Sequence, residues 1–144
     1  MTANLPKGNR WLEQFNNARF LSLETFGRNG KGVRTTTFFA EFNGLLFIST
    51  TSDTGKVKRL RGNDRVKVAP SNFRGHAKGE WVEGRARLVE RVDDINRVNH
   101  LLNKQHPFLR RLRALREIFS KAKRLVYSIQ IEDAKKSDPP LSSD

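Results

Sequence analysis

Hydroxyl-bearing and cationic side chains are concentrated in one stretch of the chain, residues 50–68. A predicted strand at residues 45–50 leads into a Thr, Ser and Gly-containing turn at residues 51–55, and a short helix with four basic residues is expected next: Lys56, Lys58, Arg59 and Arg61. Free backbone N–H groups at a helix start, hydroxyls and cations together favour binding of a phosphate or another compact anion. The Gly-x-x-x-x-Gly-Lys-Ser/Thr pattern of a P-loop is absent. Taken alone, the stretch is equally typical of a capped surface helix with a solvated basic face.

The composition indicates one soluble domain with an anionic partner. The chain has 144 residues, 36% hydrophobic and 30% charged, and its formal charge of +13 comes from 28 Lys and Arg against 15 Asp and Glu. Such an excess favours nucleic acid, a membrane surface, or a phosphorylated or carboxylated small molecule. There is no cysteine, no apolar run of about 20 residues and no apolar signal core near the N-terminus. We therefore expect a cytoplasmic protein without disulfides or thiolate metal sites.

The hydrophobic pattern predicts a mainly β protein, a small antiparallel barrel with short helices. Alternation of apolar and polar residues, Thr- and Phe-rich runs and the Asn43-Gly44 hairpin signal predict six strands: residues 19–26, 33–42, 45–50, 65–71, 80–92 and 124–132. A helix at residues 10–17 is expected within an N-terminal segment, 1–18, that precedes the barrel domain, 19–132. Two further helices, 93–104 and 108–122, form a helical insert (93–123) before the last strand. The polar, proline-containing tail, 133–144, is expected to be disordered.

In this order, the motifs resemble those of a known superfamily. The matching text is LETFGRNGKGVRTTTFF, then LLFISTTSDTGKVKRLRGNDRVKVAPSNFRG, then GEWVEGRARLVE, which together cover about residues 20–92. These motifs resemble the pyridoxamine 5'-phosphate oxidase-like, flavin- and deazaflavin-binding split β-barrel superfamily. Within it, they are most similar to the small oxidoreductases that depend on the deazaflavin coenzyme F420. The resemblance implies a six-stranded split β-barrel that forms a homodimer, with the cofactor in a cleft between two barrels.

The resemblance also assigns cofactor-binding residues. Three residues would line the ring and the ribityl chain: Arg34, Thr35 and Thr36. Five would hold the ribityl chain and the phosphate, the last in a supporting role: Ser49, Thr50, Thr51, Lys56 and Arg59. Ala69 and Pro70 would border the ring. The chain departs from the family pattern at Thr36, where proline is frequent, and at Asn72-Phe73, where the family carries a more polar pair.

By this resemblance the protein is an oxidoreductase that transfers hydride between a bound or exchangeable flavin-type cofactor, F420 or FMN, and a small organic acceptor. The cofactor supplies the redox chemistry, so no nucleophile, metal or dedicated catalytic residue is assigned. His76 is the one histidine near the predicted ring site, whereas structural roles are expected for His100 and His106. FMN ends in one phosphate, while F420 adds a carboxylate-rich oligoglutamate tail. The basic surplus favours F420 because several cations could lead such a tail away: Lys56, Lys58, Arg59, Arg61, Arg74 and Lys78.

Two other functions stay open from the sequence. Residues 108–124 form a predicted basic amphipathic helix, which is typical either of packing on the barrel or of attachment to nucleic acid or an anionic membrane. A non-enzymatic anion-binding module is therefore the principal alternative. A protein that stores or senses a flavin without turnover is the other.

Overall fold

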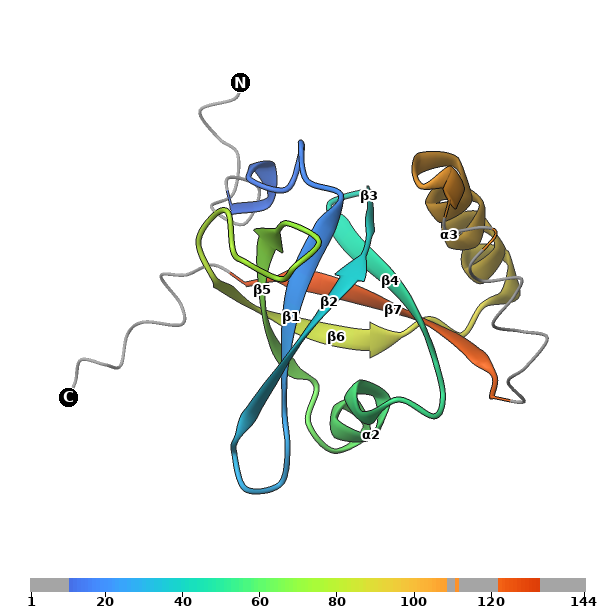
Figure 1. Ribbon diagram of the computed structural model, residues 1–144. Helices are drawn as coiled ribbons and strands as arrows, with labels where there is room; N and C mark the ends of the chain where they lie inside the picture. Colours follow the sequence, from blue (N-terminus) through green and yellow to red (C-terminus); the bar gives the residue numbers. More distant parts are fainter. Residues whose placement is uncertain (1–10, 109–110, 112–121, 133–144) are drawn as a thin grey trace.

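Seven antiparallel strands form a single sheet, in the order β2-β1-β5-β6-β7-β4-β3, within the residues that the computed structural model describes: 11–108, 111 and 122–132. Figure 1 shows that this sheet is strongly curled, with α2 at one end of the barrel and α3 beside β3 and β4. The strands are β1 (Phe20–Phe26), β2 (Gly32–Phe38), β3 (Ala40–Phe42), β4 (Leu45–Thr51), β5 (Arg65–Ser71), β6 (Val82–Leu88) and β7 (Arg124–Ile131). The helices are α2 (Gly55–Gly62) and α3 (Val92–Gln105). The predicted mainly β half-barrel, with a helix before the last strand, is confirmed.

The strand number differs from the prediction because the chain breaks at Phe39. The sequence predicts one strand at residues 33–42, but β2 pairs with β1 while β3 pairs with β4. β2 and β3 are thus the two edges of the sheet although a single residue separates them, so the sheet must curl until its edges approach each other. Phe39 is buried, and its carbonyl oxygen accepts a hydrogen bond from His106 Nε2 at 2.9 Å. The structural role expected for His106 is therefore confirmed.

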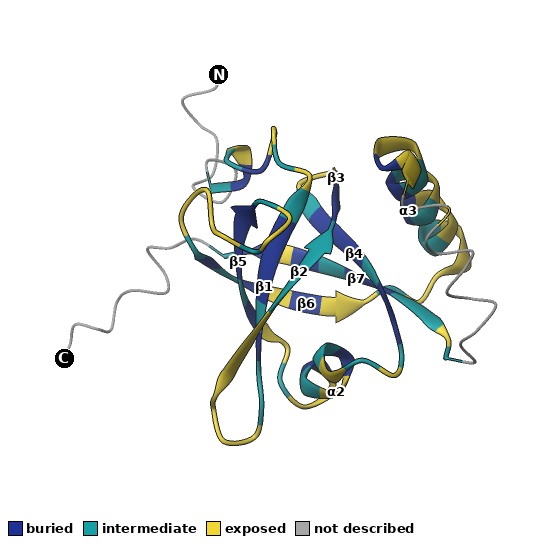
Figure 2. Cartoon of the chain, in the orientation of Figure 1, coloured by how far each residue is buried: buried dark blue, intermediate teal, exposed yellow. Residues whose placement is uncertain are grey.

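Strand alternation produces the core of the barrel. Leu21 and Leu23 of β1 are fully buried and lie in register with β5, where Val68 is also fully buried. Side chains two residues apart point to the same face of a strand, so these residues fill the inside of the curl. Figure 2 shows that β1 and β5 are largely dark blue, whereas the hairpin between β1 and β2 is largely yellow. A second cluster, between β4 and α3, includes Phe47 and Leu102 on the outside of the sheet.

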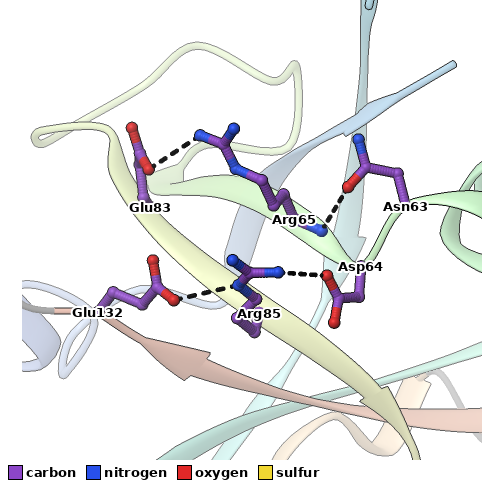
Figure 3. Close-up of polar contacts among 6 residues, drawn as sticks. All are labelled: Asn63, Asp64, Arg65, Glu83, Arg85 and Glu132. Atoms are coloured by element: carbon purple, nitrogen blue, oxygen red, sulfur yellow. Dashed lines mark hydrogen bonds and ion pairs between the residues drawn. The ribbon is translucent and has the colours of Figure 1, made fainter. Parts of the chain in front are cut away.

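An ion-pair network on the outer face joins three strands near the end of α2 (Figure 3). Arg85 of β6 donates to Asp64 Oδ1 at 2.7 Å and to Glu132 Oε2 at 3.2 Å, and Arg65 contacts Glu83 at 3.2 Å. Hydrogen bonds to Asp64 and Glu132 raise the pKa of Arg85. Because Asp64 lies between the end of α2 and the start of β5, its ion pair with Arg85 attaches this short connection to β6.

The predicted helices agree with the structure where it describes them. α2 and α3 match the predicted short basic helix and the predicted helix at 93–104. Near the N-terminus, residues 11–13 are helical and residues 14–17 form turns. Most of the predicted helix at 108–122, the predicted tail at 133–144 and the first ten residues lie outside the described residues.

Candidate cofactor site

The turn before α2 is held by its own hydroxyl groups. Thr51 Oγ1 donates to Asp53 Oδ1 at 2.6 Å, and Thr54 Oγ1 donates to the Thr51 carbonyl at 3.1 Å. Thr50 Oγ1 lies 3.2 Å from Thr54 Oγ1, and both Thr50 and Thr51 are buried. Thr54 makes no side-chain cap, and the first turn of α2 has no acidic residue. The turn before α2 is thus fixed in place by these hydroxyl bonds.

Neighbouring residues of β4 lie on opposite faces of the strand. Thr50 shares the inner face with the buried Ile48, whereas Ser49 and Thr51 lie on the outer face. Ser49 Oγ accepts a hydrogen bond from Arg124 Nη1 at 3.3 Å. Ser49, Thr50 and Thr51 are therefore neighbours in space, but their side chains lie on two different faces of the sheet.

The predicted ring residues on β2 also divide between the two faces. Arg34 and Thr36 lie on the outer face, where the Arg34 guanidinium stacks 4.3 Å from the centroid of the Trp81 ring. Arg34 also lies 3.7 Å from Glu24. Thr35 faces inward, and its Oγ1 is buried with no hydrogen-bond partner among the described residues. The curl of the sheet brings β2 into contact with β4, and we call the line of contact between these two strands the seam. Thr35 is part of β2 and therefore lies on one side of the seam.

Ala69 and Pro70 lie on β5, two strands away from Thr36. Thr36 and Ala69 are both in register with Ser22 of β1, so these three residues form one row across the outer face. Pro70 aligns with Leu21 in the adjacent row, and both Ala69 and Pro70 are buried. The structure therefore brings Thr36 and Ala69 to one surface of the sheet.

A cationic groove runs between α2 and the hairpin that joins β1 to β2. Its cavity volume is ≈ 810 Å³, and its lining includes four cations and no carboxylate: Phe26, Gly27, Arg28, Lys58, Arg59, Arg61, Gly62 and Asn63. Arg59 Nε donates to Thr25 Oγ1 at 2.6 Å, which holds the guanidinium in the wall of the groove. Arg28, Lys58 and Arg61 form no ion pair with any described residue. The groove is therefore a region of uncompensated positive charge.

Sequence reasoning missed Arg28 as a groove residue. Arg28 is 30 residues from Lys58 along the chain, and the hairpin between β1 and β2 carries it to α2. The glycine-rich turn at residues 27–32 could have indicated this position, because it predicts a protruding hairpin tip that carries two cations, Arg28 and Lys31. Lys56, Arg74 and Lys78 were expected to act with the groove cations, but they are not among its lining residues.

Tyr127 lies on the inner face of β7, in the core of the barrel. Burial raises the pKa of its hydroxyl, and the positive charge of Arg61 opposes this rise without reversing it. In the described part of the chain, no three His, Cys, Asp or Glu side chains gather as a metal site would require. None of the described helices is both long enough and apolar enough to cross a membrane.

Solved structures share this curled sheet. The haem storage protein HutZ of Vibrio cholerae matches with a TM-score of 0.64 and 14% identity over 89% of this chain and 92% of its own. A Listeria innocua protein named provisionally as a pyridoxamine 5'-phosphate oxidase matches with a TM-score of 0.61 and 15% identity, over 87% and 93% of the two chains. The fold is the pyridoxamine 5'-phosphate oxidase-like split barrel. A structure named F420 reductase has this split barrel as well, with a TM-score of 0.55 and 12% identity over 85% and 93% of the chains. No protein-family model and no curated protein matches the sequence.

The residues of this split barrel fit a flavin-type cofactor in three respects. The groove beside α2 is cationic and free of carboxylates, as an anionic arm requires. The first turn of α2 carries Lys56 and lies beside the Arg59 guanidinium, and it has no acidic residue. The buried hydroxyl of Thr35 has no partner among the described residues, and a ligand polar group at the seam would satisfy it.

Proposed function

We propose that the protein binds F420 or FMN and transfers hydride between this cofactor and a small organic acceptor. The observation that carries the proposal is the cationic groove, together with its connection to the start of α2. Arg59 makes this connection: its Nε bonds Thr25 at the groove, while its Nη1 lies 2.9 Å from the position that a Cβ atom at Gly55 would occupy. One continuous cationic path thus extends from the first residue of α2 into the groove.

In the proposed complex, each group of site residues would contact a different part of the cofactor. The N–H groups at the start of α2 and Lys56 would bind the cofactor phosphate, supported by Arg59. The Ser49 hydroxyl would meet the ribityl chain from the outer face of β4, whereas Thr50 and Thr51, which are buried and bonded within the turn, would hold the turn in place. The backbone near Thr36, Ala69 and Pro70 would border the ring, with Arg34 at its side, in a cleft completed by a second copy of the chain.

The bound cofactor would supply a hydride, which is two electrons with one proton. The acceptor would take this hydride and a second proton from water, and the cofactor would be left oxidised. The protein would contribute binding, orientation and electrostatics rather than a covalent step. His76 is exposed on the loop after β5, and solvent can therefore deliver the proton without it.

The groove favours F420 over FMN because only F420 carries an oligoglutamate tail. The double variant Lys58→Ala/Arg61→Ala is expected to weaken F420 binding about fivefold and to leave FMN binding unchanged, since exposed ion pairs contribute roughly 0.2–1 kcal/mol each. Fluorescence titration of both cofactors at low salt measures this difference. Arg87→Ala/Arg91→Ala, with two exposed arginines that line a different pocket, is the control of equal charge change. Equal losses for FMN and F420 would contradict the assignment of the groove to the tail.

Storage or sensing of a cofactor is the second candidate, favoured by the split barrel that the chain shares with HutZ. A storage protein would bind the cofactor but would not accelerate its oxidation by an acceptor. Single-turnover oxidation of the reduced cofactor, with and without the protein, separates the two functions. Acceleration by the protein supports the oxidoreductase, and unchanged rates support storage.

A further inference from the structure

The loop after β5, residues 72–79, is held by several hydrogen bonds although most of it is exposed. Asn72 Oδ1 accepts hydrogen bonds from the backbone N–H groups of Arg74 at 2.9 Å and His76 at 3.0 Å. Gly75 N–H bonds the Asn72 carbonyl at 2.9 Å, and Gly75 has a φ of 88°, which favours glycine. Lys78 N–H bonds the Pro70 carbonyl at 2.7 Å, which closes the base of the loop.

The loop lies over the outer row at Ser22, where Ser22 and Ala69 are buried, and it borders the partly exposed Thr36, beside which the proposed function places the cofactor ring. Ser22 Oγ donates to the Gly75 carbonyl at 3.0 Å. A Cβ atom at Gly75 would lie 2.6 Å from Thr36 Oγ1, so the loop backbone is in close contact with β2. Because Ser22 is in register with both Thr36 and Ala69, the loop is fixed relative to both of these residues.

This loop presents an exposed aromatic ring among cations. Phe73 is 68% exposed, and the Arg74 guanidinium lies 5.5 Å from the centroid of its ring. Lys78 is exposed as well, and residues 72–79 contain no acidic side chain. An aromatic ring beside a guanidinium suits a flat ligand with a negative charge, because the ring stacks and the cation pairs with the charged group.

We infer that this loop selects the acceptor, and that the acceptor class is a planar, negatively charged molecule. The inference rests on the proposed function, since it places the loop beside the hydride donor. Phe73 would stack on the acceptor and Arg74 would bind its anionic group. In the test reaction, a quinone takes the hydride from the reduced cofactor and a proton from water, and becomes the hydroquinone.

The experiment compares a neutral and an anionic acceptor of the same shape, naphthoquinone and naphthoquinone sulfonate, with the full chain loaded with its cofactor. Arg74→Ala is expected to raise the KM for the sulfonate about fivefold, with the KM for the neutral quinone and both kcat values unchanged. Phe73→Ala is expected to raise both KM values. Arg87→Ala, an exposed arginine on β6, is the matched control and should change neither.

Separate cofactor titrations distinguish failure of this inference from failure of the proposed function. If Arg74→Ala leaves the KM for the sulfonate unchanged, or raises both KM values equally, while cofactor binding and turnover persist, the loop assignment alone is overturned. If the wild-type protein binds neither FMN nor F420, the proposed function fails and the acceptor assignment fails with it.

Discussion

Replacement of Lys56 by alanine is expected to weaken the binding of both FMN and F420 by roughly 1–3 kcal/mol, the scale of a lost charge-assisted hydrogen bond. Both cofactors carry a phosphate, and Lys56 lies in the first turn of α2, where the proposed function places that phosphate. Isothermal titration calorimetry with each cofactor measures the loss. The effect should exceed that of the groove variants because it acts on the group that the two cofactors share.

Lys104→Ala is a suitable control for this prediction. Lys104 is an exposed cation in the last turn of α3, so the variant removes the same charge at another helix. Its cofactor affinity should equal that of the wild type. Unchanged affinity of Lys56→Ala for both cofactors, with unchanged thermal stability, would remove Lys56 from the site.

Replacement of Gly84 by alanine is expected to lower the free energy of unfolding by about 1–3 kcal/mol. Gly84 lies in β6 between Val66 of β5 and Ile131 of β7. A Cβ atom at this position would lie 2.7 Å from the carbonyl oxygen of Gln130, which is backbone and cannot turn away as a side chain can. The alanine would therefore separate β6 from β7 at the centre of the sheet. Urea unfolding followed by circular dichroism measures the change.

Gly62→Ala provides the matched glycine variant. Gly62 is the last residue of α2, and a Cβ atom there would meet nothing within 4 Å. Alanine has the higher helix propensity, so the variant should be as stable as the wild type or more stable by up to about 1 kcal/mol. A Gly84→Ala protein as stable as Gly62→Ala would contradict the close packing of β6 on β7.

Local patterns predicted the parts of the fold that depend on local chemistry. The Asn43-Gly44 hairpin forms with φ values of 54° and 79°, as a two-residue turn of this kind requires. The short basic helix expected after residues 51–55 forms as α2 and ends at Asn63. The alternation that predicted a strand at 19–26 corresponds to the buried Leu21 and Leu23 of β1.

Long-range pairing determines what the sequence alone could not predict. The Thr- and Phe-rich run at 33–42 has one uniform β pattern, yet its two halves pair with different strands and separate at Phe39. The approach of Arg28 to α2 and the folding of Gly75 onto Thr36 likewise depend on contacts between segments distant along the chain. The sequence assigned each predicted cofactor residue to a strand, a turn or the basic helix. It did not show which of Thr35 and Thr36 faces the inside of the barrel.

Equilibrium titration of the wild-type chain with FMN and with F420, side by side, tests the central claim most directly. We expect saturable binding of at least one cofactor, tighter for F420, and retained at moderate salt because the phosphate site at α2 does not depend on surface charge alone. Absence of saturable binding for both cofactors, together with steeply salt-dependent binding of random single-stranded DNA, would contradict it and identify the protein as a non-enzymatic polyanion-binding module.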